Sequence, residues 1–90
     1  MKTIYKYPLA IADSQAIKVP GEAKILCVQL QMDTLTLWAQ VDPNNIPSTR
    51  TIEVFGTGHP MDDGCRSYIG TVQEGSLVWH VFERHTLIAS

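Results

Sequence analysis

The chain has 90 residues, of which 44% are hydrophobic and 18% charged, and its formal net charge is −2. This length leaves room for one domain, and the apolar content is typical of a packed globular core rather than of a disordered segment. Every apolar run is too short to span a membrane, and the seven basic residues are scattered along the chain. We therefore expect neither a membrane protein nor a protein that binds long nucleic acids.

Alternation of apolar and polar residues predicts β-strands throughout the first half of the chain. The predicted strands are 2–7, 15–19, 23–31 and 34–42. In the third of these, Leu26, Val28 and Leu30 are expected to share one face, because side chains on a strand alternate between its faces. In the fourth, one face carries Leu35, Leu37, Ala39 and Val41. The polar residues 31–33 between these two strands indicate a hairpin turn.

The second half continues the pattern with predicted strands at 50–55, 68–73 and 76–84. Glu74-Gly75 indicates a tight hairpin turn between the last two, because glycine accepts a positive φ. Residues 60–64 have room for at most one helical turn. We therefore expect an all-β, single-domain antiparallel sandwich or barrel of about seven short strands over 1–90, with 85–90 as a C-terminal tail.

The segment that departs from this pattern is Gly56-Thr57-Gly58-His59, followed by a proline. Flanking glycines let backbone N–H groups point into one concavity that suits a phosphate or carboxylate, with the Thr57 hydroxyl and the His59 ring as further donors. A strand end with a rigid turn explains the same residues without a ligand. His59 with Asp62 and Asp63 suggests a metal site, although solvated turn aspartates fit these residues better. His59 with Asp62 or Cys65 suggests a small hydrolase, but no nucleophile motif surrounds them.

Aromatic residues on polar strand faces are a second candidate for binding. Trp38 shares its face with threonines and a glutamine, so it packs against another strand, lies at a subunit interface, or stacks on a ligand. Tyr5 and Tyr7 share a face opposite Lys6 and offer the same alternatives. Three isolated lysines are able to converge in space for a small anion: Lys2, Lys6 and Lys24.

Two further observations concern assembly and compartment. The last strand is apolar on both faces, with His80 on one of them, which suggests a central position in a sheet or cover of one face by a neighbouring subunit. Leu87-Ile88 near the end of the chain also suggests self-association, so we expect a homo-oligomer. The start of the chain lacks the apolar run of a signal peptide, so we expect a cytoplasmic protein with Cys27 and Cys65 reduced. The cysteine spacing does not match a zinc site, and we expect no cofactor.

Several segments together resemble a family of small uncharacterised phage and prophage proteins. They include Met-Lys-Thr-Ile-Tyr-Lys-Tyr at the start and Gly-Thr-Gly-His-Pro at 56–60, and the similarity extends through Glu83. The resemblance implies a phage-encoded accessory protein that acts in the host bacterial cytoplasm. It carries over no catalytic residue.

Together these features lead us to expect an anti-defence protein that sequesters a small anionic, nucleotide-derived immune signal without catalysis. The candidate ligand-binding residues are Tyr5, Lys6, Tyr7, Trp38, Gly56, Thr57, Gly58 and His59. One alternative is a protein–protein inhibitor or virion-associated module that binds a host protein through its aromatic faces. A small hydrolase is the other.

Overall fold

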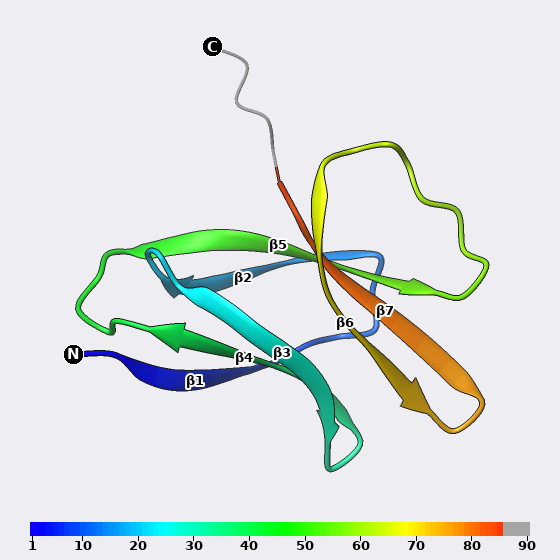
Figure 1. Ribbon diagram of the computed structural model, residues 1–90, viewed down its shortest axis with the longest axis horizontal. Coiled ribbons are helices and arrows are strands. Elements are labelled where there is room, and N and C mark those ends of the chain that lie inside the picture. Colours follow the sequence, from blue (N-terminus) through cyan, green and yellow to red (C-terminus); the bar gives the residue numbers. More distant parts are fainter. Residues whose placement is uncertain (86–90) are drawn as a thin grey trace.

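The computed structural model describes residues 1–85, which form seven β-strands in two antiparallel sheets (Figure 1). The strands are β1 (Thr3–Pro8), β2 (Ser14–Pro20), β3 (Lys24–Gln31), β4 (Thr34–Val41), β5 (Pro47–Gly56), β6 (Arg66–Glu74) and β7 (Leu77–Arg84). The predicted all-β fold is confirmed. This part of the chain contains no helix, and so none of a length that crosses a membrane. The predicted tail from residue 86 onward and its Leu87-Ile88 pair lie outside the described residues.

The two sheets have the strand orders β1-β4-β3 and β2-β5-β7-β6, which we call the three-stranded and the four-stranded sheet. The chain changes sheet between β1 and β2, between β2 and β3, and between β4 and β5. The loop between β5 and β6 lies on the opposite side of the molecule from the N-terminus (Figure 1). The connection order therefore separates the β1 end of the three-stranded sheet from the Gly-Thr-Gly-His segment.

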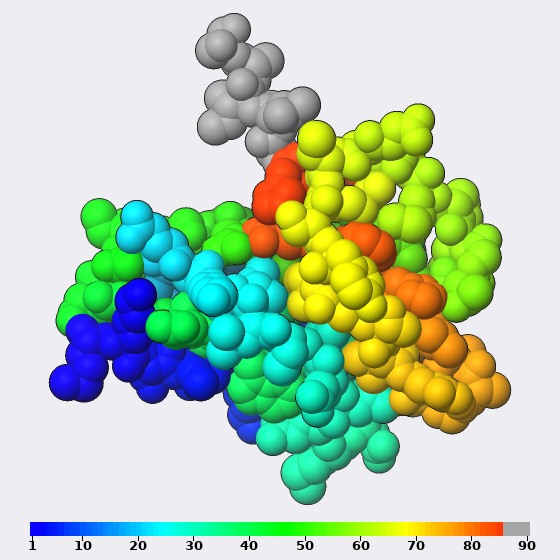
Figure 2. Space-filling view, in the orientation of Figure 1, coloured from blue at the N-terminus to red at the C-terminus, as the bar shows by residue number. Residues whose placement is uncertain are grey.

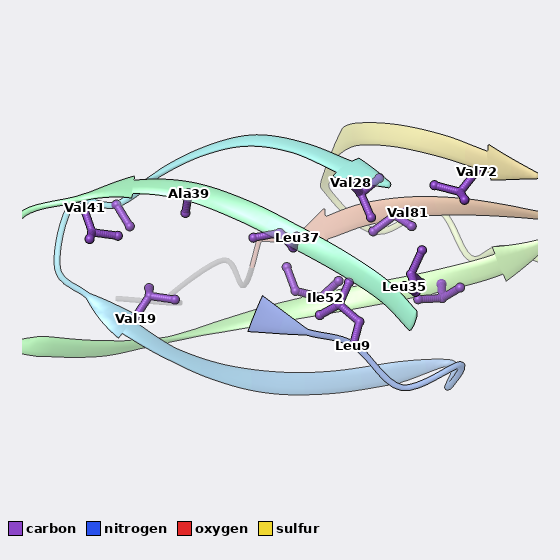
Figure 3. Packing of buried hydrophobic residues seen from close by; sticks show 12 residues of the cluster. Leu9, Val19, Val28, Leu35, Leu37, Ala39, Val41, Ile52, Val72 and Val81 are labelled. Atoms are coloured by element: carbon purple, nitrogen blue, oxygen red, sulfur yellow. The ribbon is translucent and has the colours of Figure 1, made fainter. Parts of the chain in front are cut away.

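The core fills the space between the two layers of strands (Figure 3). The predicted inner face of β4 is confirmed, since Leu35, Leu37, Ala39 and Val41 are each at most 2% exposed. They pack with side chains of the four-stranded sheet, among which Ile52 and Val81 are fully buried. One apolar cluster thus joins both sheets.

Two β-bulges lie where β3 of one sheet meets β6 of the other, and Figure 2 shows these strands side by side. The first interrupts the pairing between Ile25 and Cys27, so that Leu26 does not share the face of Val28 and is 42% exposed, which corrects the prediction. The second lies between Tyr68 and Gly70. A Cβ atom on Gly70 would lie 2.9 Å from Val28 Cγ1, so glycine permits the close approach of the sheets here.

The hairpin turns agree with the sequence in place but differ in detail. Met32 and Asp33 form the predicted β3–β4 turn, with φ values of 49° and 65°. The β6–β7 turn consists of Gly75 and Ser76 rather than Glu74-Gly75, with Gly75 at φ 59° in its first position. A type II′ turn takes glycine at this position, which explains the one-residue shift.

A charged pair lies at the edge of the core between the sheets. Arg50 on β5 donates from Nε and Nη2 to both carboxylate oxygens of Glu83 on β7, and the Nη2–Oε1 distance is 2.8 Å. Arg50 Nη1 also donates to the carbonyl oxygen of Ala23, just before β3, at 2.8 Å. The Arg50 side chain is 24% exposed and that of Glu83 is 9% exposed. The guanidinium therefore connects the four-stranded sheet to the chain entering the three-stranded one.

Candidate functional site

The structure divides the predicted site residues among three places. Lys6 and Trp38 are direct cross-strand partners on the outer face of the three-stranded sheet. Tyr5 and Tyr7 point the other way, because they pair with the core residues Ala39 and Leu37. The segment 56–59 belongs to the four-stranded sheet and its following loop. Lys6 lines a hollow with residues of β3, β4 and their turn, whereas Gly56, Thr57 and His59 line a different one with residues 76–79.

We call the outer face of the three-stranded sheet the Trp38 face. Trp38 is half-buried on the central strand, between Lys6 of β1 and Cys27 of β3. In the neighbouring row, Lys24 pairs with Gln40. The members of this face are Ile4, Lys6, Pro8, Lys24, Cys27, Gln29, Gln31, Thr34, Thr36, Trp38 and Gln40. Two of the three lysines that the sequence leaves free to converge thus lie on the same sheet face as Trp38, on the strands to either side of β4.

The electrostatics of this face follow from its strand sequences. None of β1, β3 and β4 contains an aspartate or glutamate, and they carry Lys6 and Lys24. An isolated lysine pair is a weak anion site on a mixed surface, but here no carboxylate on the same strands offsets it. The part of the Trp38 face around Lys6 is therefore locally cationic on a chain whose net charge is −2, whereas Glu22 and Asp42 lie beside Lys24.

Two hollows flank Trp38 along β4. The first, which we call the Lys6 hollow, has a volume of about 300 Å³ and is lined by Lys6, Pro8, Gln31, Met32, Thr34 and Thr36. Lys6 Nζ donates to Gln31 Oε1 at 2.8 Å, which leaves two of its three protons for a ligand. The second, the Lys24 hollow, has about 200 Å³ and mixes charges and amides: Lys2, Glu22, Lys24, Gln40, Asp42 and Asn45.

The Gly-Thr-Gly-His segment uses its polar groups internally. The His59 N–H donates to the Gly56 carbonyl at 3.0 Å, and the Gly56 N–H donates to His59 Nδ1 at 3.1 Å. Gly58 has φ 87°, which a type II turn requires at its third position. Because Nδ1 accepts a hydrogen bond, the proton of the neutral ring is on Nε2. The Gly56 N–H, which the sequence offers to an anion, is thus taken by the histidine of the same turn.

Thr57 is held in the same way by a chain of hydrogen bonds across the outer face of the four-stranded sheet. Its Oγ1 lies 2.8 Å from His80 Nε2, and His80 Nδ1 lies 3.1 Å from Thr71 Oγ1. Tyr68 Oη continues the chain at 2.6 Å from Thr71 Oγ1. His80 is therefore a hydrogen-bonded histidine on the sheet surface, fixed at both nitrogens.

The last strand, for which the sequence suggests a central position or cover by another subunit, is central, since β7 lies between β5 and β6, and aromatic residues of these strands meet on its outer face. The Phe82 ring packs edge-on against Phe55 and Tyr68, with centroid distances of 5.9 Å and 5.4 Å. Arg66 lies over the Phe55 ring, 5.4 Å from its centroid. These contacts leave Phe55 and Phe82 half-buried, whereas Tyr68 stays 61% exposed.

A second network fixes the loop between β5 and β6. Asp62 accepts hydrogen bonds from the Gly64 N–H at 2.7 Å, from Arg84 Nη1 at 2.8 Å and from Arg66 Nη2 at 2.8 Å. The Gly64 N–H and then the two guanidinium groups lower the pKa of Asp62 to about 2. Its oxygens are thus engaged by donors rather than open to an ion, and within residues 1–85 no three His, Cys, Asp or Glu side chains are grouped as metal ligands.

The hollow beside this loop is rich in carboxylates. It has a volume of about 440 Å³, and Asp13, Glu53 and Asp62 line it together with His59. Glu53 and Asp62 form ion pairs with Arg66, so the positive charge of that arginine is already compensated. This arrangement is less suited to an anion than the Trp38 face.

The sequence reasoning missed the part that Gln31, Thr34 and Thr36 play beside Lys6. Their alternation marks them as outward-facing, but only the pairing of β1 and β3 with β4 brings them around one hollow.

Comparison with known proteins gives a family but no activity. No curated protein and no solved structure gives a significant match. A family model described as a domain of unknown function, DUF7352, matches residues 1–89. Because this match covers nearly the whole length, the chain belongs to the DUF7352 family.

Proposed function

We propose that this protein binds a small anionic, nucleotide-derived ligand on the Trp38 face and does not turn it over. The observation that carries the proposal is the direct pairing of Lys6 with Trp38 on a sheet whose three strands contain no carboxylate. A base stacks on the indole while the ammonium group meets the phosphate. Stacking of a base on an aromatic side chain contributes about 1–3 kcal/mol.

The surroundings of Trp38 suit such a ligand. Thr34 and Gln31 carry a hydroxyl and an amide at the rim of the Lys6 hollow, and Pro8 and Met32 supply apolar walls. A few polar groups on an apolar wall are typical of small-molecule sites. Of the residues expected to bind, Lys6 and Trp38 remain in the proposed site, and Lys24 and Gln31 join them.

The loop at 56–59 is outside the proposed site and has a structural role. The Gly56 N–H and the Thr57 hydroxyl are engaged by His59 and His80. One hollow beside the loop is lined by three carboxylates, and the other is lined mainly by Leu77, Val78 and Trp79, so neither supplies a lysine or arginine and we assign the loop to the structure of the four-stranded sheet.

Tyr7 lies on the inner face of β1 and is assigned to packing, since it contacts the core. Tyr5 is 43% exposed but lies on the opposite face of β1 from Lys6, so it is outside the proposed site.

The resemblance to phage proteins supplies the biological role in this proposal. A protein that binds a nucleotide signal without catalysis lowers the free concentration of that signal in the host cytoplasm. The proposal needs only groups of one chain, and it leaves self-association as a separate expectation.

A second candidate function is inhibition of a host protein through the same face. Ile4 is 58% exposed and Leu26 42% exposed, and both lie near Trp38. Exposed apolar side chains around a tryptophan are typical of protein interfaces.

Titration calorimetry with AMP, ATP, ADP-ribose and cyclic dinucleotides tests the proposal. We expect binding by the wild type and a loss of about tenfold or more in affinity for Trp38→Ala and Lys6→Gln, because each removes one principal contact. His59→Ala is the matched control and should bind as the wild type does. Ligand recovered intact after heating the complex separates sequestration from hydrolysis.

Three results would overturn the proposal. One is the absence of heat with every nucleotide for a sample whose circular dichroism shows a folded protein, which leaves the host-protein candidate. Another is loss of binding in His59→Ala with binding retained in Trp38→Ala, which moves the site to the loop. The third is conversion of the nucleotide during incubation, which would favour the alternative that the protein is a small hydrolase.

A further inference from the structure

The Trp38 face has two separate hollows rather than one. The Lys6 hollow includes Thr34 and Thr36 of β4, and the Lys24 hollow includes Gln40 of the same strand. Trp38 lies between Thr36 and Gln40 and on the same face. A ligand stacked on the indole therefore has a polar hollow at each of two opposite edges of its base.

The spacing of the hollows sets the length of ligand that fills both. Thr36 and Gln40 are four residues apart, which corresponds to about 13 Å at the rise of an antiparallel strand. A mononucleotide with its base on Trp38 and its phosphate beside Lys6 extends to only one side of the indole. The Lys24 hollow then stays without a ligand group.

The two hollows also differ in charge. Lys6 is the only charged residue in the first, which suits a terminal phosphate. In the second, Lys2 and Lys24 are balanced by Glu22 and Asp42, and Gln40 and Asn45 add amides. Donors and acceptors together suit a sugar and a base edge, with a lysine beside the phosphodiester that leads to them.

We infer that the preferred ligand is a linear dinucleotide with a terminal phosphate, which places that phosphate in the Lys6 hollow, its first base on Trp38 and its second nucleoside in the Lys24 hollow. This inference rests on the proposed function, because it assigns the ligand class of the same face. It distinguishes the protein from a mononucleotide binder, which needs one hollow, and from a binder of longer strands, which needs a third.

Calorimetry with AMP, the 5′-phosphorylated dinucleotide pApA, the trinucleotide pApApA and cyclic di-AMP tests the inference. We expect pApA to bind at least tenfold more tightly than AMP and as tightly as pApApA, with cyclic di-AMP weaker because it lacks a terminal phosphate. Lys24→Gln should weaken pApA more than AMP and so remove the advantage of pApA. Lys6→Gln should weaken both ligands.

Lys18→Gln is the matched control, because Lys18 is an exposed lysine on β2 of the other sheet. Equal affinity for AMP and pApA, or an equal effect of Lys24→Gln and Lys18→Gln, would overturn the inference while the proposed function stands. Tighter binding of cyclic di-AMP than of pApA would overturn the terminal-phosphate assignment. If none of the four ligands binds the folded protein, both proposals fail for this class of ligand.

Discussion

At the scale of single residues, Asp62 shows how one exposed side chain organises a loop. Its carboxylate receives a backbone N–H from its own loop and guanidinium groups from the beginning of β6 and the end of β7. Arg84 also pairs with Glu53 of β5 at 3.3 Å. The loop between β5 and β6 is thereby attached to three strands of the four-stranded sheet.

The pKa of Asp62 predicts an acid-sensitive loop. Folding lowers this pKa from 3.8 to about 2, chiefly through the Gly64 N–H, so the folded state favours the carboxylate. The resulting stabilisation is present above about pH 4 and is lost as the pH falls toward 2. In thermal unfolding between pH 5 and 2, we expect Asp62→Asn to lose part of the pH dependence that the wild type shows.

Asp63→Asn serves as the control, because Asp63 is the exposed neighbour in the same loop. If Asp62→Asn and the wild type lose stability in parallel over this range, the hydrogen bonds to Asp62 do not stabilise the folded state.

At the scale of elements, the turn of the β3–β4 hairpin consists of residues that do not favour its backbone conformation. Met32 and Asp33 both have positive φ, and Met32 is 94% exposed, so its side chain gains little from packing. The left-handed conformation costs a residue of the L configuration roughly 1–2 kcal/mol, and asparagine tolerates it best after glycine. The turn therefore reduces the stability of the hairpin.

Met32→Asn should stabilise the protein by about 1 kcal/mol, because asparagine is favoured at the first position of a type I′ turn. Urea unfolding measures the change. Met61→Asn is the control at an exposed methionine without positive φ and should give no gain. A Met32→Asn variant no more stable than the wild type would mean that methionine adopts this turn without cost.

The sequence predicts a structural feature well where the residues that determine it are close together in the chain. The inner face of β4 follows from alternation within eight residues, and the structure confirms it. The bulge beside Leu26 does not, because it occurs where β3 meets Gly70 of a strand forty residues later. The glycines of the 56–59 turn were recognised, but the histidines that occupy its donors act through side-chain geometry that a sequence pattern does not carry.

At the scale of the whole molecule, Arg50 connects the two sheets. It pairs with Glu83 inside the four-stranded sheet and donates to the carbonyl of Ala23 at the entry to β3. The Glu83 hydrogen bond raises the pKa of Arg50, and burial opposes this change. The pair thus stabilises the contact between the two sheets at the edge of the apolar core, where the side chains are partly exposed to solvent.

Glu83→Gln should destabilise the protein by about 2–4 kcal/mol in urea unfolding. Breaking a buried ion pair costs roughly 3–5 kcal/mol, and the 24% exposure of Arg50 reduces the penalty. The double variant Arg50→Met/Glu83→Leu should recover part of the loss, because it leaves no unpaired charge. A double variant less stable than Glu83→Gln would show that the pair contributes favourable energy beyond its own desolvation.

The Trp38 face marks the limit of sequence reasoning at this scale. The sequence marks the lysines and Trp38 individually as candidates, but Lys6 and Lys24 lie on strands that are adjacent to β4 on opposite sides. Lys6 and Lys24 share one sheet face because of the strand order β1-β4-β3, which no local sequence pattern predicts. The same order separates Lys6 and Trp38 from the loop with which they were first grouped.

The changes of sheet along the chain have a consequence for biosynthesis. β1 and β2 pair only with β4 and β5, so the first twenty residues leave the ribosome without their partner strands. They stay unpaired until residues 34–56 have followed, whereas the β6–β7 hairpin closes as soon as it emerges. All-β chains with such distant pairing fold in milliseconds to seconds, so the segment that carries Lys6 joins its sheet only after β4 has been synthesised.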